Sequence, residues 1–230
     1  MAVSHGFNLT EATTSVSAPV QVSSGLQIIV GTAPVNQLAN PAAAANTPLY
    51  VSTYKEAVAA LGWSNDFAKY TLCEAVSANF QVVGVAPIVV VNVLDPANKK
   101  HITALDETSV QVNDGVAEID KVGILLEKLV VKNGPTALAA DVDYIASFDD
   151  DGTVSLALIT GGAGDGATTL TVSGSILDAS KVTADDIVGG VNIATGAETG
   201  LEVIRQVYPK LSKAPAIPVS YTHLTLPTKL

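Results

Sequence analysis

One glycine-rich stretch of this 230-residue chain has spacing close to that of a phosphate-binding loop. A P-loop needs Gly-Lys-Ser/Thr after four spacer residues, because the lysine reaches the β/γ-phosphates. Within residues 161–169 (GGAGDGATT), Gly161 and Gly166 have this separation, but Ala167 takes the lysine position. The stretch is therefore interpreted as a glycine-rich hairpin loop between two strands.

The acidic run at residues 149–152 (DDDG) is the candidate for a calcium site. An EF-hand loop places glycine at its sixth position and carboxylates at its first and twelfth. With Gly152 as the sixth residue, the first is Ser147 and the twelfth is Leu158, so neither end supplies a carboxylate. The run is instead typical of a tight hairpin turn with solvated side chains.

Histidine is nearly absent from the chain. The histidines are His5, His101 and His223, and no Ser/His/Asp set, Cys/His set or metal cluster can be assembled from residues so placed. Cys73, the single cysteine, has apolar neighbours at helical spacing, which is typical of a small core residue. We therefore predict no catalytic, cofactor-binding or metal-binding residue, and not an enzyme.

The charge balance narrows the classes of partner. The chain has 22 Asp and Glu against 12 Lys and Arg, a formal net charge of −10, with no basic stripe to replace phosphate counterions. No run approaches the roughly 18 apolar residues of a membrane span. The N-terminus lacks the basic and apolar regions of a signal peptide. We expect a protein that binds neither nucleic acid nor membrane and is cytoplasmic when synthesised.

Residues 25–96 read as an α/β layer. A continuous apolar run, LQIIVGTAP, predicts a buried strand, and residues 37–48 are expected to be a loop. A capping-box pair, Thr53 and Glu56, begins a helix that ends at Gly62. A second helix is predicted from DFAKYTLCEAVSANFQ and a strand buried on both faces from APIVVVNVLDP.

The pattern changes after Pro96. Residues 97–182 alternate at period 2 between turn signals at Asp114-Gly115, Asn133-Gly134 and Asp151-Gly152, which predicts an antiparallel β domain. Helical patterns resume in residues 183–218, where Thr183 and Asp186 form a second capping-box pair, and Asp185 and Asp186 suit a helix N-terminus. A last helix carries an apolar stripe of Leu201, Ile204, Val207 and Tyr208. The β domain is therefore predicted to be inserted into the α/β layer.

Residues 1–24 have the pattern of an extended arm. Val16, Ala18, Val20 and Val22 alternate as in a strand, and Pro19 restricts that strand to a sheet edge or to another molecule's sheet. We therefore predict that these four residues form an inter-subunit strand added to a neighbour's sheet.

Several of these stretches together resemble the contractile tail sheath proteins of bacteriophages. They are the arm leading into VGTAP, then EAVAALGW, TLCEAVSANFQ with PIVVVNVLDP, DASKVTADDIVGG, and TGLEVIRQVYPKLSKAP. The resemblance implies a structural subunit, without catalysis or cofactor, that polymerises around a tail tube and contracts to drive it through a cell envelope. It implies neighbouring sheath subunits, the tail tube protein, and baseplate and tail terminator proteins as partners. It also implies assembly in the host cytoplasm and a final place in the virion.

The ending VSYTHLTLPTKL, residues 219–230, does not continue this pattern. In the family the chain continues through more α/β core and a C-terminal arm, so the core layer here is expected to be incomplete. Codons permitted for VSYTHLTLPT match, in one frame, a transposon-end adapter used in sequencing libraries. We interpret residues 219–230 as translated adapter.

Two other functions remain open from the residues alone. A surface-layer or adhesion-type assembly protein shares the acidic, Thr/Val/Gly-rich texture but is expected to carry a secretion signal. A doubly wound α/β enzyme needs polar residues at strand C-termini, where this chain has Thr32, Asn92 and Asp95. Asp95 precedes Pro96 and is better interpreted as a strand-ending turn residue.

Overall fold

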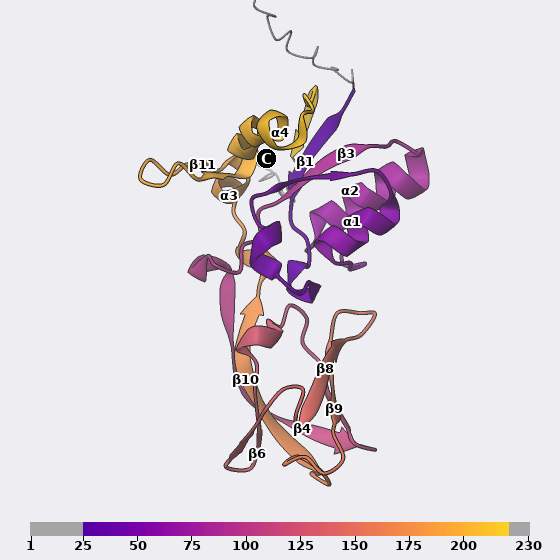
Figure 1. Ribbon diagram of the computed structural model, residues 1–230, viewed down its shortest axis with the longest axis vertical. Coiled ribbons are helices and arrows are strands. Elements are labelled where there is room, and N and C mark those ends of the chain that lie inside the picture. The colour runs from indigo at the N-terminus through magenta and orange to yellow at the C-terminus, as the bar shows by residue number, and fades with distance from the viewer. Residues whose placement is uncertain (1–24, 221–230) are drawn as a thin grey trace, which may run out of the picture.

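The structure is a computed structural model that describes residues 25–220. It combines a layer of helices and parallel strands with a long, curled antiparallel sheet that extends from one side of that layer (Figure 1). The arm residues Val16, Ala18, Val20 and Val22 lie outside the described residues. Their predicted strand is therefore not part of the fold described below.

The α/β layer is built on a four-stranded sheet of order β13-β1-β3-β2. Its strands are β1 (Gln27–Gly31), β2 (Pro48–Val51), β3 (Ile88–Asn92) and β13 (Ile217–Ser220). β1 lies between β3 and β13 and is parallel to both, whereas β2 is antiparallel to β3. All five residues of β3 are buried, as expected of a central parallel strand that is covered on both faces.

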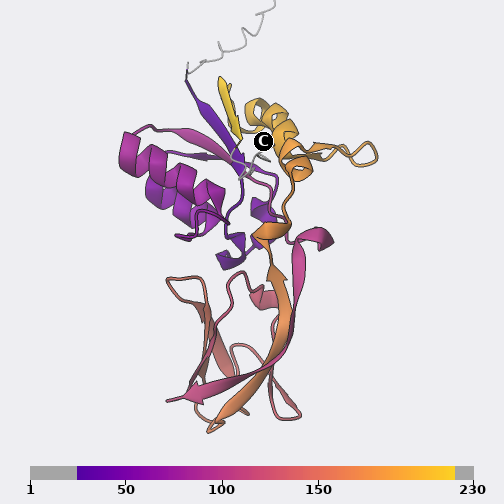
Figure 2. The ribbon, with the colours of Figure 1, turned by 180° about the vertical axis from the view of Figure 1, so that it is seen from behind.

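Helices cover both faces of this sheet (Figures 1 and 2). On one face lie α1 (Tyr54–Leu61) and α2 (Thr71–Ser77), which continues as a π-helical turn (Ala78–Val83). On the other lie α3 (Ala184–Val188), a 3₁₀ turn (Gly200–Val203) and α4 (Ile204–Leu211). Successive side chains of β1 point to opposite faces, so Ile29 packs in the core beneath α1 and α2, and Ile28 in the core beneath α3 and α4.

The second sheet has seven strands in the order β7-β6-β10-β4-β5-β9-β8, and every neighbouring pair is antiparallel. The strands are β4 (Ile102–Asn113), β5 (Val116–Ile119), β6 (Val130–Asn133), β7 (Thr136–Leu138), β8 (Tyr144–Phe148), β9 (Val154–Leu158) and β10 (Thr169–Leu177). The two longest strands, β4 and β10, carry the chain away from the α/β layer and back (Figure 1). The sheet encloses its own apolar core, in which Val154, Leu156 and Val172 are fully buried.

The hairpin turns predicted in this segment are confirmed. Asp114 and Gly115 both have positive φ, 50° and 81°, as a type I′ turn between β4 and β5 requires. Gly134 follows β6, and Gly152 lies between β8 and β9, with φ of 55° and 86°. The glycine-rich residues 161–169 lead from β9 into the first residue of β10, as the loop interpretation expected.

The second helix begins later than predicted. It starts at Thr71, because hydrogen bonds fix the preceding turn to the end of β1. The Thr32 hydroxyl donates to the Lys69 carbonyl at 2.6 Å. The Thr32 amide donates to the Thr71 hydroxyl at 3.1 Å, and the Thr71 amide donates to the Thr32 hydroxyl at 3.2 Å.

Other details also differ from the expectation. A 3₁₀ turn at Val35–Gln37 precedes the predicted loop of residues 37–48, and a second one at Pro41–Ala44 lies within it. The loop leads into β2, a short edge strand that the sequence pattern did not predict. Tyr208, predicted in the apolar stripe of the last helix, is half exposed. At the end of the described chain, Val219 pairs with Ile29 within β13, so the predicted boundary before residue 219 falls inside a strand.

Candidate functional site

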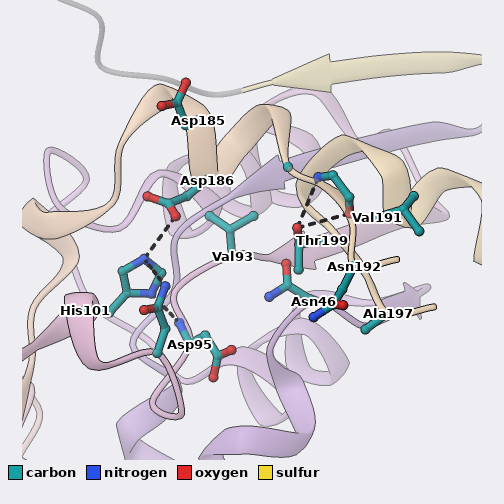
Figure 3. Close-up of a pocket in the computed structure, with 13 residues that line it drawn as sticks. Asn46, Val93, Asp95, His101, Asp185, Asp186, Val191, Asn192, Ala197 and Thr199 are labelled. Atoms are coloured by element: carbon teal, nitrogen blue, oxygen red, sulfur yellow. Dashed lines mark hydrogen bonds and ion pairs between the residues drawn. The ribbon is translucent and has the colours of Figure 1, made fainter. Parts of the chain in front are cut away.

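A pocket of about 450 Å³ lies where the antiparallel sheet joins the α/β layer. Its walls come from the residues after β3, the start of α3, and a hairpin formed by β11 (Gly190–Val191) and β12 (Glu198–Thr199). Figure 3 shows His101, Asp95 and Asp186 on one side and Thr199 and Asn192 on the other. Among the residues that line this pocket, Asp95, His101, Asp185 and Asp186 have side chains that can do acid–base chemistry.

His101 is the central residue of the junction and is 1% exposed. Its Nδ1 accepts a hydrogen bond from the Asp95 backbone amide at 3.0 Å, so the proton of the neutral ring is on Nε2. Nε2 faces Asp186 Oδ1 at 3.5 Å. Both ring nitrogens are therefore occupied by protein groups, and neither is free to take a proton from a substrate.

Asp186 holds the other side of this contact. Its Oδ2 accepts hydrogen bonds from the Thr183 amide at 2.8 Å and the Thr183 hydroxyl at 2.7 Å, which confirms the predicted capping-box pair of α3. Burial raises the pKa of Asp186, but the hydrogen bonds from Thr183 and the nearby His101 outweigh it and hold that pKa below its usual value. The carboxylate thus stays ionised and links α3 to the histidine.

The sequence predicts Asp186 at the start of a helix and gives no sign that it contacts His101. The fold brings the two side chains together across 85 positions of sequence, 186 minus 101. No local pattern signals this pairing, because it depends on β4 and β10 returning the chain to the same place. The pair ties the start of β4 to the start of α3.

The other polar residues near strand ends satisfy one another. Asn92 is fully buried, and its Oδ1 accepts hydrogen bonds from the amides of Ala33 at 3.0 Å and Leu94 at 3.1 Å. Its Nδ2 donates to the Leu94 carbonyl at 2.8 Å. The Thr199 hydroxyl, on the pocket wall, is within 3.3 Å of both the amide and the carbonyl of Gly190. These groups shape the backbone and present no activated nucleophile.

Cys73 is a buried residue of α2 and belongs to the core between that helix and the sheet, as its apolar spacing predicted. Burial raises the pKa of its thiol to about 11, so the reactive thiolate is a very small fraction at neutral pH.

Within residues 25–220, no three His, Cys, Asp or Glu side chains are grouped so that they could hold a metal ion. No helix in the same range is long and apolar enough to cross a membrane.

The sheet of the α/β layer offers a surface for another strand. β13 pairs with β1 on one side and, among the described residues, has no strand on its other side. Ile217 at its start is 46% exposed. An edge of this kind presents unpaired backbone amides and carbonyls that an added strand can bind.

Comparison with known proteins finds similarity to a phage protein. No family model matches the chain. Over 207 residues, 89% of its length, the chain is 31% identical to the tail sheath protein of Burkholderia phage BcepMu. The chain spans 40% of the length of that relative.

Proposed function

Because the chain is related to a phage tail sheath protein, we propose that it is part of a structural subunit of a contractile tail sheath. The subunits polymerise around a tail tube and contract to drive that tube through a cell envelope. The single observation that carries this proposal is similarity along 89% of the chain, which is too extensive to involve only the α/β layer or only the antiparallel sheet.

The chemistry of the described residues supports a structural rather than a catalytic role. His101 has both ring nitrogens engaged, and Asn92 is enclosed by backbone hydrogen bonds. The contacts of His101 with Asp95 and Asp186 therefore serve to hold the antiparallel sheet against the α/β layer. The proposed partners are neighbouring sheath subunits, the tail tube protein, and the baseplate and tail terminator proteins, within the virion.

Strand exchange is the proposed means of joining subunits. Within residues 1–24, Val16, Ala18, Val20 and Val22 alternate as in a strand, and Pro19 suits a strand that is added at the edge of a neighbour's sheet. Each backbone hydrogen bond of an added strand contributes only about 1 kcal/mol net, but a strand of about five residues supplies several. Such links hold subunits together while their folded bodies rotate.

The test is assembly of the complete reading frame, expressed and imaged by negative-stain electron microscopy. We expect hollow cylinders from the wild type and dispersed subunits after deletion of residues 1–24. Two single variants form a matched test and control. Val20→Asp places a charge on the apolar face of the predicted strand and should prevent assembly, whereas Gln21→Asp places it on the opposite face and should not. Cylinders that form equally with Val20→Asp and with Gln21→Asp would remove the basis for strand exchange.

A further inference from the structure

The β11–β12 hairpin extends outward from the α/β layer, away from the rest of the molecule (Figures 1 and 2). Ile193 at its tip is 99% exposed, and Val188 and Val191 at its base are 59% and 43% exposed. Glu198 is the only charged residue from 187 to 201. An exposed, nearly uncharged cluster of large aliphatic side chains is characteristic of an interaction surface.

The hairpin is built to hold this tip in one conformation. Asn192 Oδ1 accepts hydrogen bonds from the amides of Ala194 at 3.0 Å and Thr195 at 3.3 Å, and the Asn192 amide donates to the Ala197 carbonyl at 2.8 Å. At the base, a Cβ on Gly189 would collide with the Thr199 carbonyl. Ile193 is therefore presented on an ordered loop, which lowers the entropy cost of binding.

A second exposed apolar cluster lies in the segment that joins α2 to β3. Val82 and Val83, at the end of the π-helical turn, are 79% and 68% exposed. Residues 75–94 contain no charged side chain. Both views of the molecule show this segment at the opposite end of the α/β layer from the β11–β12 hairpin (Figures 1 and 2).

We propose that the hairpin tip at Ile193 of one copy packs against Val82 and Val83 of the next copy, in a head-to-tail contact. Two different surfaces on opposite ends of one layer cannot pair with each other within a single copy, but they pair between copies and generate a ring or a helix. In a chain of net charge −10, both surfaces are nearly free of charge, so like-charge repulsion is least where they meet. The choice of a second copy as partner rests on the proposed sheath function.

The test uses sedimentation velocity on the 230-residue chain and three single variants. Ile193→Asp and Val83→Asp each place a charge in one of the two surfaces. Because each variant loses the burial of an aliphatic side chain, we expect its self-association to be about tenfold to a hundredfold weaker than that of the wild type. Val142→Asp is the matched control, because Val142 is 64% exposed in the antiparallel domain and outside both surfaces. It should change the association constant by less than about twofold.

Mixing provides the decisive arm. Ile193→Asp retains an intact Val82–Val83 surface, and Val83→Asp retains an intact hairpin, so an equimolar mixture should form heterodimers that do not grow further. Unchanged association of either variant, or a mixture that stays monomeric, overturns the proposal. A wild-type chain that remains monomeric also overturns it and indicates that the rest of a longer chain covers these surfaces. None of these outcomes affects the sheath proposal, whose test is assembly of the complete protein and its dependence on residues 1–24.

Discussion

Replacing Asp186 by asparagine tests whether the junction depends on a carboxylate with two accepting oxygens. One oxygen accepts from the amide and hydroxyl of Thr183, and the other faces Nε2 of the buried His101. An amide has one oxygen, so in Asp186→Asn the NH₂ group must face either the Thr183 amide or the His101 N–H. Either arrangement leaves a donor without an acceptor.

The magnitude follows from that unmade hydrogen bond. Leaving one such group unsatisfied costs about 1–3 kcal/mol, and losing a negative charge from the first turn of α3 adds about 0.3–1 kcal/mol. For a chain of this size, each kcal/mol lowers the midpoint of thermal unfolding by about 2–4 °C. Asp185→Asn is the control, because Asp185 is exposed in the same helical turn and loses only the charge.

The assay is thermal unfolding followed by circular dichroism at several pH values. The pKa of Asp186 is lowered in the folded state, so its contribution is present above the unfolded carboxyl pKa of about 4 and is lost as pH falls through the lower folded value. The difference between wild type and Asp186→Asn should therefore be large at pH 7 and shrink below about pH 4. If Asp186→Asn melted together with Asp185→Asn at pH 7, the two-oxygen account of the junction would be wrong.

Gly189→Ala should lower the free energy of unfolding, measured in urea, by about 1–3 kcal/mol, because Gly189 has a φ of 69° and a Cβ there would collide with backbone atoms. Gly190→Ala is the control, because a Cβ at Gly190 meets open space, and it should cost about 1 kcal/mol or less. Cys73 should react with a thiol reagent at pH 8 only at the rate of unfolding, since burial raises its pKa to about 11; rapid labelling of the native protein would contradict its core position. Residues 97–182 expressed alone should melt cooperatively with β-type circular dichroism, because their sheet encloses its own core; a disordered spectrum would show that they need the α/β layer.

Local patterns predicted the elements whose signals are contained in adjacent residues. The turn at Asp114-Gly115 is set by two residues that tolerate positive φ, and β3 is set by a run of apolar residues buried on both faces. The capping box of α3 joins Thr183 and Asp186, three residues apart, so it was predictable from the sequence in the same way.

Features that depend on distant contacts were not predictable in this way. The late start of α2 at Thr71 comes from hydrogen bonds to Thr32, 39 positions earlier. The pairing of His101 with Asp186 requires the whole antiparallel sheet to lie between them in sequence. β2 is a four-residue edge strand that begins with Pro48, too short for its alternation to be distinguished from a loop.

The sheath role is tested most directly by co-expressing the complete protein with a phage tail tube protein and imaging the product by cryo-electron microscopy. The account predicts two concentric cylinders, with residues 25–220 fitting density in the outer one. Bare tubes beside unassembled subunits, or density for this chain in the tube itself, would contradict it.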